Sequence, residues 1–198
     1  MDRTLVASIA LLSLLGAGAA SAAPAGGGAF AFTGAHLGMS LGDWRALPFP
    51  GGPDRRVQPA CTGDAGAGRV ALLEPTPAER KSGAVACGYV ARYGAVALAQ
   101  GIRPAKDRSP VQVRYLFVKG RLADIRYRAS RDAFDRVTAR LKAAYGPPRA
   151  VVRDEVSTEI GRLERVHMSW STPAGSAVLT DPADARLDLA VELSSRTP

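Results

Sequence analysis

The stretch of residues 111–148 limits the possible folds more than any other part of this chain, because it holds a complete hairpin pattern followed by a complete helix pattern. Apolar and polar side chains alternate over residues 111–117 and again over residues 123–129, which is the period of a strand with one buried face. Lys119-Gly120 lies between the two runs and is a turn signal. The stretch therefore predicts a β-hairpin.

The pairing of these two strands follows from keeping one face apolar. A two-residue turn would place Tyr115 opposite Asp124 and mix the two faces. A three-residue loop over residues 118–120, with its glycine in the left-handed conformation as a bulge, instead pairs Tyr115 with Ala123. We expect this second register.

Residues 131–145 carry the clearest helix pattern in the chain. Apolar side chains recur at helical spacing at Phe134, Val137, Leu141, Ala144 and Tyr145. Ser130 can cap the free amides of the first turn, and Gly146 followed by two prolines ends the helix. The apolar stripe of this helix needs a sheet to cover, and the preceding hairpin provides one.

The rest of the chain predicts one more helix and several strands. The helix is expected over about 40–47, where Ser40 is the N-cap and Asp43 is the acid of a capping box. Strands are expected over residues 30–33, 70–73, 84–93, 95–99, 150–160, 165–171, 177–180 and 187–193, and loops over residues 53–66 and 75–83. Because short turns leave no room for parallel crossovers, we expect an α+β fold, mostly antiparallel sheet with two helices packed on it.

The N-terminus has the pattern of a signal peptide over residues 1–22. Arg3 precedes an apolar run over residues 5–15, and Ala20-Ser21-Ala22 predicts cleavage before Ala23. A membrane anchor of similar length is the alternative, but the run fades into Gly and Ala and no basic stop follows it. We therefore expect a periplasmic or secreted protein with no transmembrane segment after cleavage.

The mature chain divides into three parts by composition. Residues 23–29 are a flexible leader of Ala, Pro and Gly. Residues 30–129 contain a helix and antiparallel strands that end in the hairpin, and residues 130–198 contain the second helix and further antiparallel strands. We expect the last two parts to form one compact unit.

Cys61 and Cys87 are the only cysteines. In an exported chain, a single pair most simply forms a disulfide. A catalytic or redox thiol is the alternative, and the chain has no C-x-x-C motif to support it.

The chain is basic, with a formal net charge of +8. This charge attracts anionic surfaces such as lipid headgroups or acidic polysaccharide. It is mostly arginine, scattered among acids without a polybasic block and with few aromatic residues to stack on bases. This pattern argues against nucleic-acid binding.

Residues for catalysis or metal binding are scarce. The two histidines, His36 and His167, belong to no metal-spacing motif, and we expect neither a cofactor nor a metal ion. His167 is out of phase with Trp170, so it is expected on the open face of its strand. The alternative to a non-catalytic protein is a small periplasmic enzyme, or a protein of the enzyme-inhibitor type, with a site in the loops around His36 and Arg55-Arg56.

Arg114, Arg126 and Arg128 all fall on the polar face of the hairpin. Like charges across strands destabilise a sheet unless acids or an anionic partner offset them. If the protein has a contact surface, we expect it to be this face, which suits an acidic protein patch or an anionic envelope polymer. The alternative is that acids such as Asp124, or others from the second half, neutralise it.

Residues 30–129 contain two short motifs, Leu37-Gly38-Met39-Ser40 opening a helix and Tyr115-x-Phe117-x-x-Gly120-x-Leu122-x-x-Ile125 in the hairpin. With these motifs the segment resembles the β-lactamase-inhibitor-protein fold, which small outer-membrane-assembly lipoproteins share. The chain departs from the pattern in lacking the lipid-bearing cysteine and the second helix, and in having Pro48-Phe49-Pro50 after the first helix. The resemblance implies a non-catalytic envelope protein that binds other proteins.

Overall fold

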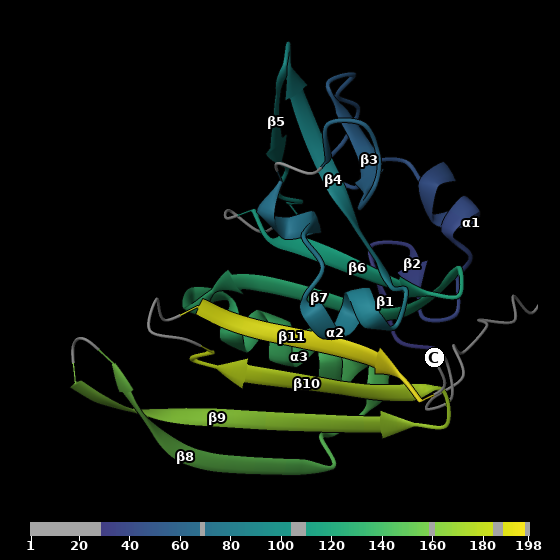
Figure 1. Cartoon of the computed structure of the whole chain (residues 1–198). Helices are drawn as coiled ribbons and strands as arrows, with labels where there is room; N and C mark the ends of the chain where they lie inside the picture. Colours follow the sequence, from purple (N-terminus) through teal and green to yellow (C-terminus); the bar gives the residue numbers. More distant parts are fainter. Residues whose placement is uncertain (1–28, 68–69, 104–109, 159–160, 184–187, 197–198) are drawn as a thin grey trace, which may run out of the picture.

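The computed structural model of the protein describes residues 29–67, 70–103, 110–158, 161–183 and 188–196 (Figure 1). The predicted signal segment lies outside these residues. The α-helices are α1 (Leu41–Ala46), α2 (Pro77–Lys81) and α3 (Phe134–Tyr145), with 3-10 turns at Ala71–Leu73 and Arg131–Ala133. The strands are β1 (Ala31–Phe32), β2 (Ala35–His36), β3 (Val57–Cys61), β4 (Val85–Tyr93), β5 (Val96–Ala99), β6 (Gln112–Val118), β7 (Arg121–Ser130), β8 (Ala150–Thr158), β9 (Gly161–Thr172), β10 (Gly175–Asp181) and β11 (Asp188–Ser195).

One large antiparallel sheet contains strands from both halves of the chain. Its order is β3-β4-β6-β7-β11-β10-β9-β8, with β5 paired to β4, and the two halves meet where β7 pairs with β11. The predicted α+β class is thus confirmed as a sheet-rich, antiparallel fold. The four predicted C-terminal strands are confirmed as β8 to β11.

The helices α3 and α2 lie on opposite faces of this sheet (Figure 1). Val137 and Leu141 of α3 are buried in one core with Ile125 and Val191 of the sheet. α1 joins the same core through Trp44, whose ring lies 5.0 Å from that of Tyr115. No helix in the described parts of the chain is long and apolar enough to cross a bilayer.

The N-terminal boundary of α3 differs from the prediction. Ser130 is still the last residue of β7, paired with Asp188, and makes no side-chain cap hydrogen bond. The chain then passes through the 3-10 turn at Arg131–Ala133, so the helix starts later than predicted. At the other end, Gly146 has a φ of 80° as expected of a glycine stop. Its carbonyl accepts a hydrogen bond of 2.9 Å from Trp170 Nε1, which ties the end of the helix to β9.

The register predicted for the central hairpin is wrong. Lys119 and Gly120 both have positive φ, 51° and 75°, and form a two-residue turn. Tyr115 pairs with Ile125 instead of Ala123, because the register shifts at a bulge between Leu116 and Phe117. The bulge shifts the pairing by one residue, as the predicted three-residue loop would, so the apolar side chains still share a face.

Three segments of the first half also differ from the prediction. The predicted strand at residues 70–73 is a 3-10 turn, because β3, β5 and β6 already occupy both edges of β4 beside it. The predicted loop at residues 53–66 contains β3, which has Pro59 and no regular alternation. The predicted loop at residues 75–83 contains a third helix, α2.

The disulfide between Cys61 and Cys87 is confirmed. The two cysteines are directly opposite each other in β3 and β4, and their Cα atoms lie 4.0 Å apart. The bond therefore joins β3, which was predicted as a loop, to the neighbouring strand β4.

Candidate functional site

The candidate site is the sheet face opposite α3, which we call the open face. Its side chains form three cross-strand rows: Gln112, Arg128, Ala190, Thr180, His167 and Val152; Arg114, Arg126, Glu192, Val178, Ser169 and Ala150; and Leu116, Asp124, Ser194, Ser176 and Ser171. Most of the residues from β9, β10 and β11 are small, so this part of the face has few protruding side chains. All three predicted arginines lie on it, as expected.

The β6 side of the open face is covered. Arg114 makes two hydrogen bonds of 2.7 Å to the carboxylate of Glu79 from α2, and its Nε donates to the carbonyl of Leu72 at 3.0 Å. The Arg114 side chain is only 13% exposed. The Arg114 guanidinium lowers the pKa of Glu79 to about 2. Arg114 thus already has an anionic partner inside the protein.

Arg126, directly opposite Arg114, remains half exposed, with 48% of its side chain accessible. Its Nε donates to Asp124 at 2.9 Å and its Nη2 lies 2.8 Å from Glu192. Ser194 donates a further hydrogen bond of 2.7 Å to Asp124. Burial raises the pKa of Asp124 to about 6 despite these donors. The alternative that acids of the chain neutralise this face is therefore observed at Arg126.

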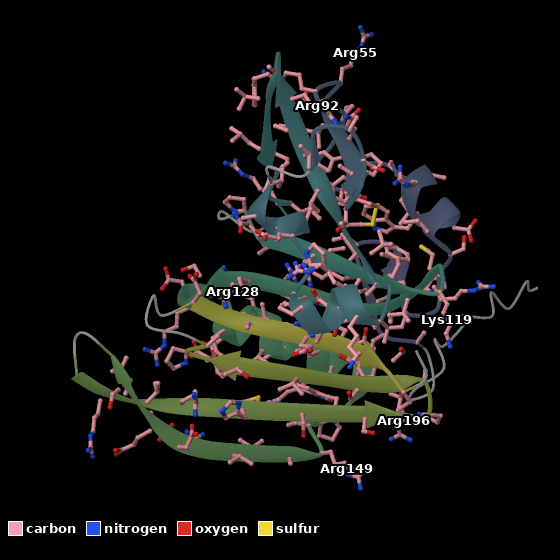
Figure 2. All side chains as sticks on the ribbon, in the orientation of Figure 1. Arg55, Arg92, Lys119, Arg128, Arg149 and Arg196 are labelled. Atoms are coloured by element: carbon pink, nitrogen blue, oxygen red, sulfur yellow. A yellow bond between two sulfur atoms is a disulfide. The ribbon has the colours of Figure 1, made fainter. Side chains whose placement is uncertain are left out.

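A pocket of about 380 Å³ brings the three arginines together at the boundary between the covered and uncovered parts. It is lined by Leu72, Gln112, Arg114, Arg126, Tyr127, Arg128, Ala190, Val191 and Glu192. Arg128 is exposed and lies near the C-terminal end of β7, on the left in Figure 2. Whether an anionic partner binds these arginines stays a prediction.

His167 lies on the open face as predicted, between Thr180 and Asp154. Its Nδ1 is 3.0 Å from the Thr180 hydroxyl, but its Nε2 is 3.7 Å from the nearest Asp154 oxygen, beyond hydrogen-bond distance. Both Asp154 oxygens accept hydrogen bonds from Arg165, which lowers the pKa of the acid. Asp154 is therefore held by Arg165 and does not orient the imidazole, so the arrangement is a polar cross-strand network and not a proton relay.

The residues of the alternative enzyme site are not brought together. His36 is exposed on β2, where its Nδ1 lies 3.1 Å from the carbonyl of Leu37. Arg55 projects from the far end of the molecule, beside β3 and the β4–β5 turn (Figure 2). Among the described residues, no three side chains of His, Cys, Asp or Glu are close enough to hold a metal ion.

Glu79 is the important residue of this face that the sequence prediction missed. Thr76-Pro77-Ala78-Glu79 is a helix-start signal, and the structure has the complete capping box, with Thr76 N–H donating to Glu79 at 2.7 Å. The pattern could therefore have revealed α2. It could not have shown that α2 packs on Arg114, which lies 35 residues further along the chain.

Comparison of the chain with protein-family models, with curated proteins and with solved structures gives no match. The resemblance to the β-lactamase-inhibitor-protein fold therefore stays a prediction.

Proposed function

We propose that the protein is a non-catalytic, exported factor of the bacterial envelope that binds another protein through the uncovered part of its open face. The observation that carries this proposal is the pocket where Arg126 and Arg128 meet Glu192 and Leu72. Such a pocket offers charged donors beside an apolar wall, which suits an acidic side chain of a partner.

The charges of the open face favour a protein over an anionic polymer. Arg126 is shared by Asp124 and Glu192, and Arg165 is held by Asp154. A uniformly charged polymer would meet these carboxylates as well as the arginines and would be repelled by them. A protein surface can match both signs of charge.

The shape of the face supports the same proposal. Ala190, Ser176 and Ser169 are small and leave the centre of the sheet accessible, while Val178 and Val152 add exposed apolar area, 36% and 56% accessible. Arginine is enriched at protein interfaces, so the arginines beside these exposed valines support a protein partner. Export is supported by the disulfide and by the predicted signal peptide.

The test is site-specific photo-crosslinking in the protein's own envelope. A photoreactive amino acid replaces Val178 on the open face or, as a control, exposed Lys142 on α3. We expect a discrete crosslinked protein from position 178 only, and Ala190→Arg should abolish it whereas Ala143→Arg on α3 should not. Equal crosslinking from both positions, or none from position 178, would contradict the proposal.

A further inference from the structure

The hairpin formed by β4 and β5 exposes an apolar side. Tyr93, Val96 and Leu98 are 49%, 55% and 54% exposed. Tyr93 pairs with Val96, and Leu98 pairs with Ala91, so all of these side chains lie on one side of the hairpin. They are half of the large hydrophobic residues exposed in the described chain; the other three are the valines of β8 and β10.

The opposite side of the same hairpin is covered. Val90 is buried in a small core with Leu73, and Ala97 and Ala99 pack against that core. On the apolar side, other side chains cover the part of the hairpin nearer the body of the protein, where Tyr89 packs against Trp44 and Phe49. The hairpin therefore continues an apolar surface beyond the residues that bury it, and it projects from the rest of the fold (Figure 1).

Positive charge lies at the same end of the molecule. The guanidinium of Arg56, which is paired with Asp54, lies 5.4 Å from the centre of the Tyr93 ring. Arg55 is exposed, has no ion pair with any described residue, and projects beside the hairpin turn in Figure 2. The chain as a whole has a net charge of +8, so the protein is attracted to anionic surfaces.

We propose that this hairpin binds the surface of an anionic phospholipid bilayer, with Val96 and Leu98 in the outer acyl region, Tyr93 at the headgroups and Arg55 on a lipid phosphate. Amphipathic segments with aromatic and basic residues beside an apolar strip bind at this depth. A projecting hairpin with three exposed apolar side chains is small for a protein interface, which usually takes about 20 to 30 residues from each partner.

This inference goes beyond the proposed function and is independent of it. The hairpin extends from the β3 end of the sheet, whereas β8 to β11 lie at the other end (Figure 1). A protein held at a bilayer by the hairpin would keep its open face accessible to a partner.

The test is binding of the purified mature protein, with its disulfide intact, to vesicles of phosphatidylglycerol mixed with phosphatidylcholine and to vesicles of phosphatidylcholine alone. We expect binding to the anionic vesicles that weakens as salt is added. The double variant Val96→Ser, Leu98→Ser should weaken binding about tenfold or more, because it removes the apolar contact. Arg55→Gln should weaken it about fivefold, as expected of one arginine at an anionic surface.

Two matched controls separate the hairpin from general charge and hydrophobicity. Val178→Ser removes an exposed valine from the open face, and Arg149→Gln removes an exposed arginine at the other end of the molecule (Figure 2). Neither should change vesicle binding by more than about twofold. The inference is overturned if the wild-type protein does not bind anionic vesicles, or if the serine double variant binds them as well as wild type while keeping its urea midpoint. A hairpin that serves a protein partner would give the first of these results.

Discussion

Arg114 and Arg126 are the same residue type, on the same sheet face, directly opposite each other in neighbouring strands, yet their surroundings differ. Arg114 is covered by α2 and the residues before it, and its hydrogen bonds go to Glu79 and to backbone carbonyls. Arg126 faces solvent on one side and is shared by two acids of the sheet. The arginine face is thus divided into a part covered by α2 and a part exposed to solvent.

The acids on the two sides show the same difference. Glu79 has its pKa lowered to about 2 because Arg114 binds both of its oxygens. Asp124 has its pKa raised to about 6, because burial outweighs the donors around it. The bidentate pair with Arg114 thus lowers the pKa of Glu79, whereas the single hydrogen bond from Arg126 does not outweigh the burial of Asp124.

The largest predicted effect concerns Arg114. Arg114→Gln leaves Glu79 buried without its partner and should lower the free energy of unfolding by about 3 to 5 kcal/mol. The matched change Arg126→Gln affects a half-exposed pair and should cost about 1 kcal/mol or less. Urea denaturation measures both, and equal losses would show that the two arginines are not in different environments.

The pH dependence sharpens the same prediction. The pKa of Glu79 is lower in the folded protein than its ordinary value, so its contribution is present above about pH 4.5 and is lost as the pH falls toward 2. In Arg114→Gln this acid-dependent loss should be much smaller.

The next effect belongs to the disulfide, which joins β3 to β4. Cys61 and Cys87 are separated by 26 positions, so Cys61→Ser, Cys87→Ser should lower the free energy of unfolding by about 3 to 4 kcal/mol. Thiol labelling of the denatured, unreduced wild-type protein should find no free cysteine. Two labelled thiols would contradict the bond.

Asp124 should show the opposite pH dependence from Glu79. Its pKa is raised on folding, so the protonated form favours the fold, and stability from this group is lost as the pH rises from about 4 through 6. Asp124→Asn should not show this loss. Between pH 4 and pH 7, the free energy of unfolding of the wild type should fall by about 1 to 3 kcal/mol more than that of Asp124→Asn. Parallel stability curves for the two proteins would contradict the raised pKa.

The smallest effect tests two helix starts. Thr76 caps α2, and Thr76→Ala should cost about 1 kcal/mol. Ser130→Ala is the control, because Ser130 makes no cap hydrogen bond, and it should cost less than about 0.5 kcal/mol. The reverse order in thermal or urea unfolding would mean that the cap is at Ser130 after all.

The comparison also shows how far the sequence determines this fold. Alternation placed Arg114, Arg126 and Arg128 on one face correctly, because the period of a strand fixes which side chains share a face. It did not fix the register, because a loop bulge and a strand bulge both restore the same alternation. The choice between them depends on the backbone of Lys119 and Gly120, for which the sequence has no further signal.

The other features that the sequence did not predict depend on contacts between residues far apart in the chain. The cap at Thr76 is a local pattern, but the contact between Glu79 and Arg114 depends on how α2 lies on the sheet. β3 has too little alternation to be recognised from its own sequence. It is a strand because it pairs with β4, to which the bond between Cys61 and Cys87 also joins it. The divided arginine face was therefore beyond sequence reasoning, although each of its arginines was found.

The most direct test of the divided face is the yield of the crosslink from position 178 in two double variants, measured over a range of salt concentrations. Arg126→Gln, Arg128→Gln alters the uncovered part, and Arg149→Gln, Lys142→Gln removes two exposed positive charges outside the open face (Figure 2). We predict that the first pair loses most of the crosslinked partner and the salt dependence of its yield, whereas the second pair keeps both. An unchanged yield in Arg126→Gln, Arg128→Gln, in a protein that still unfolds at the wild-type urea concentration, would contradict a binding role for this face.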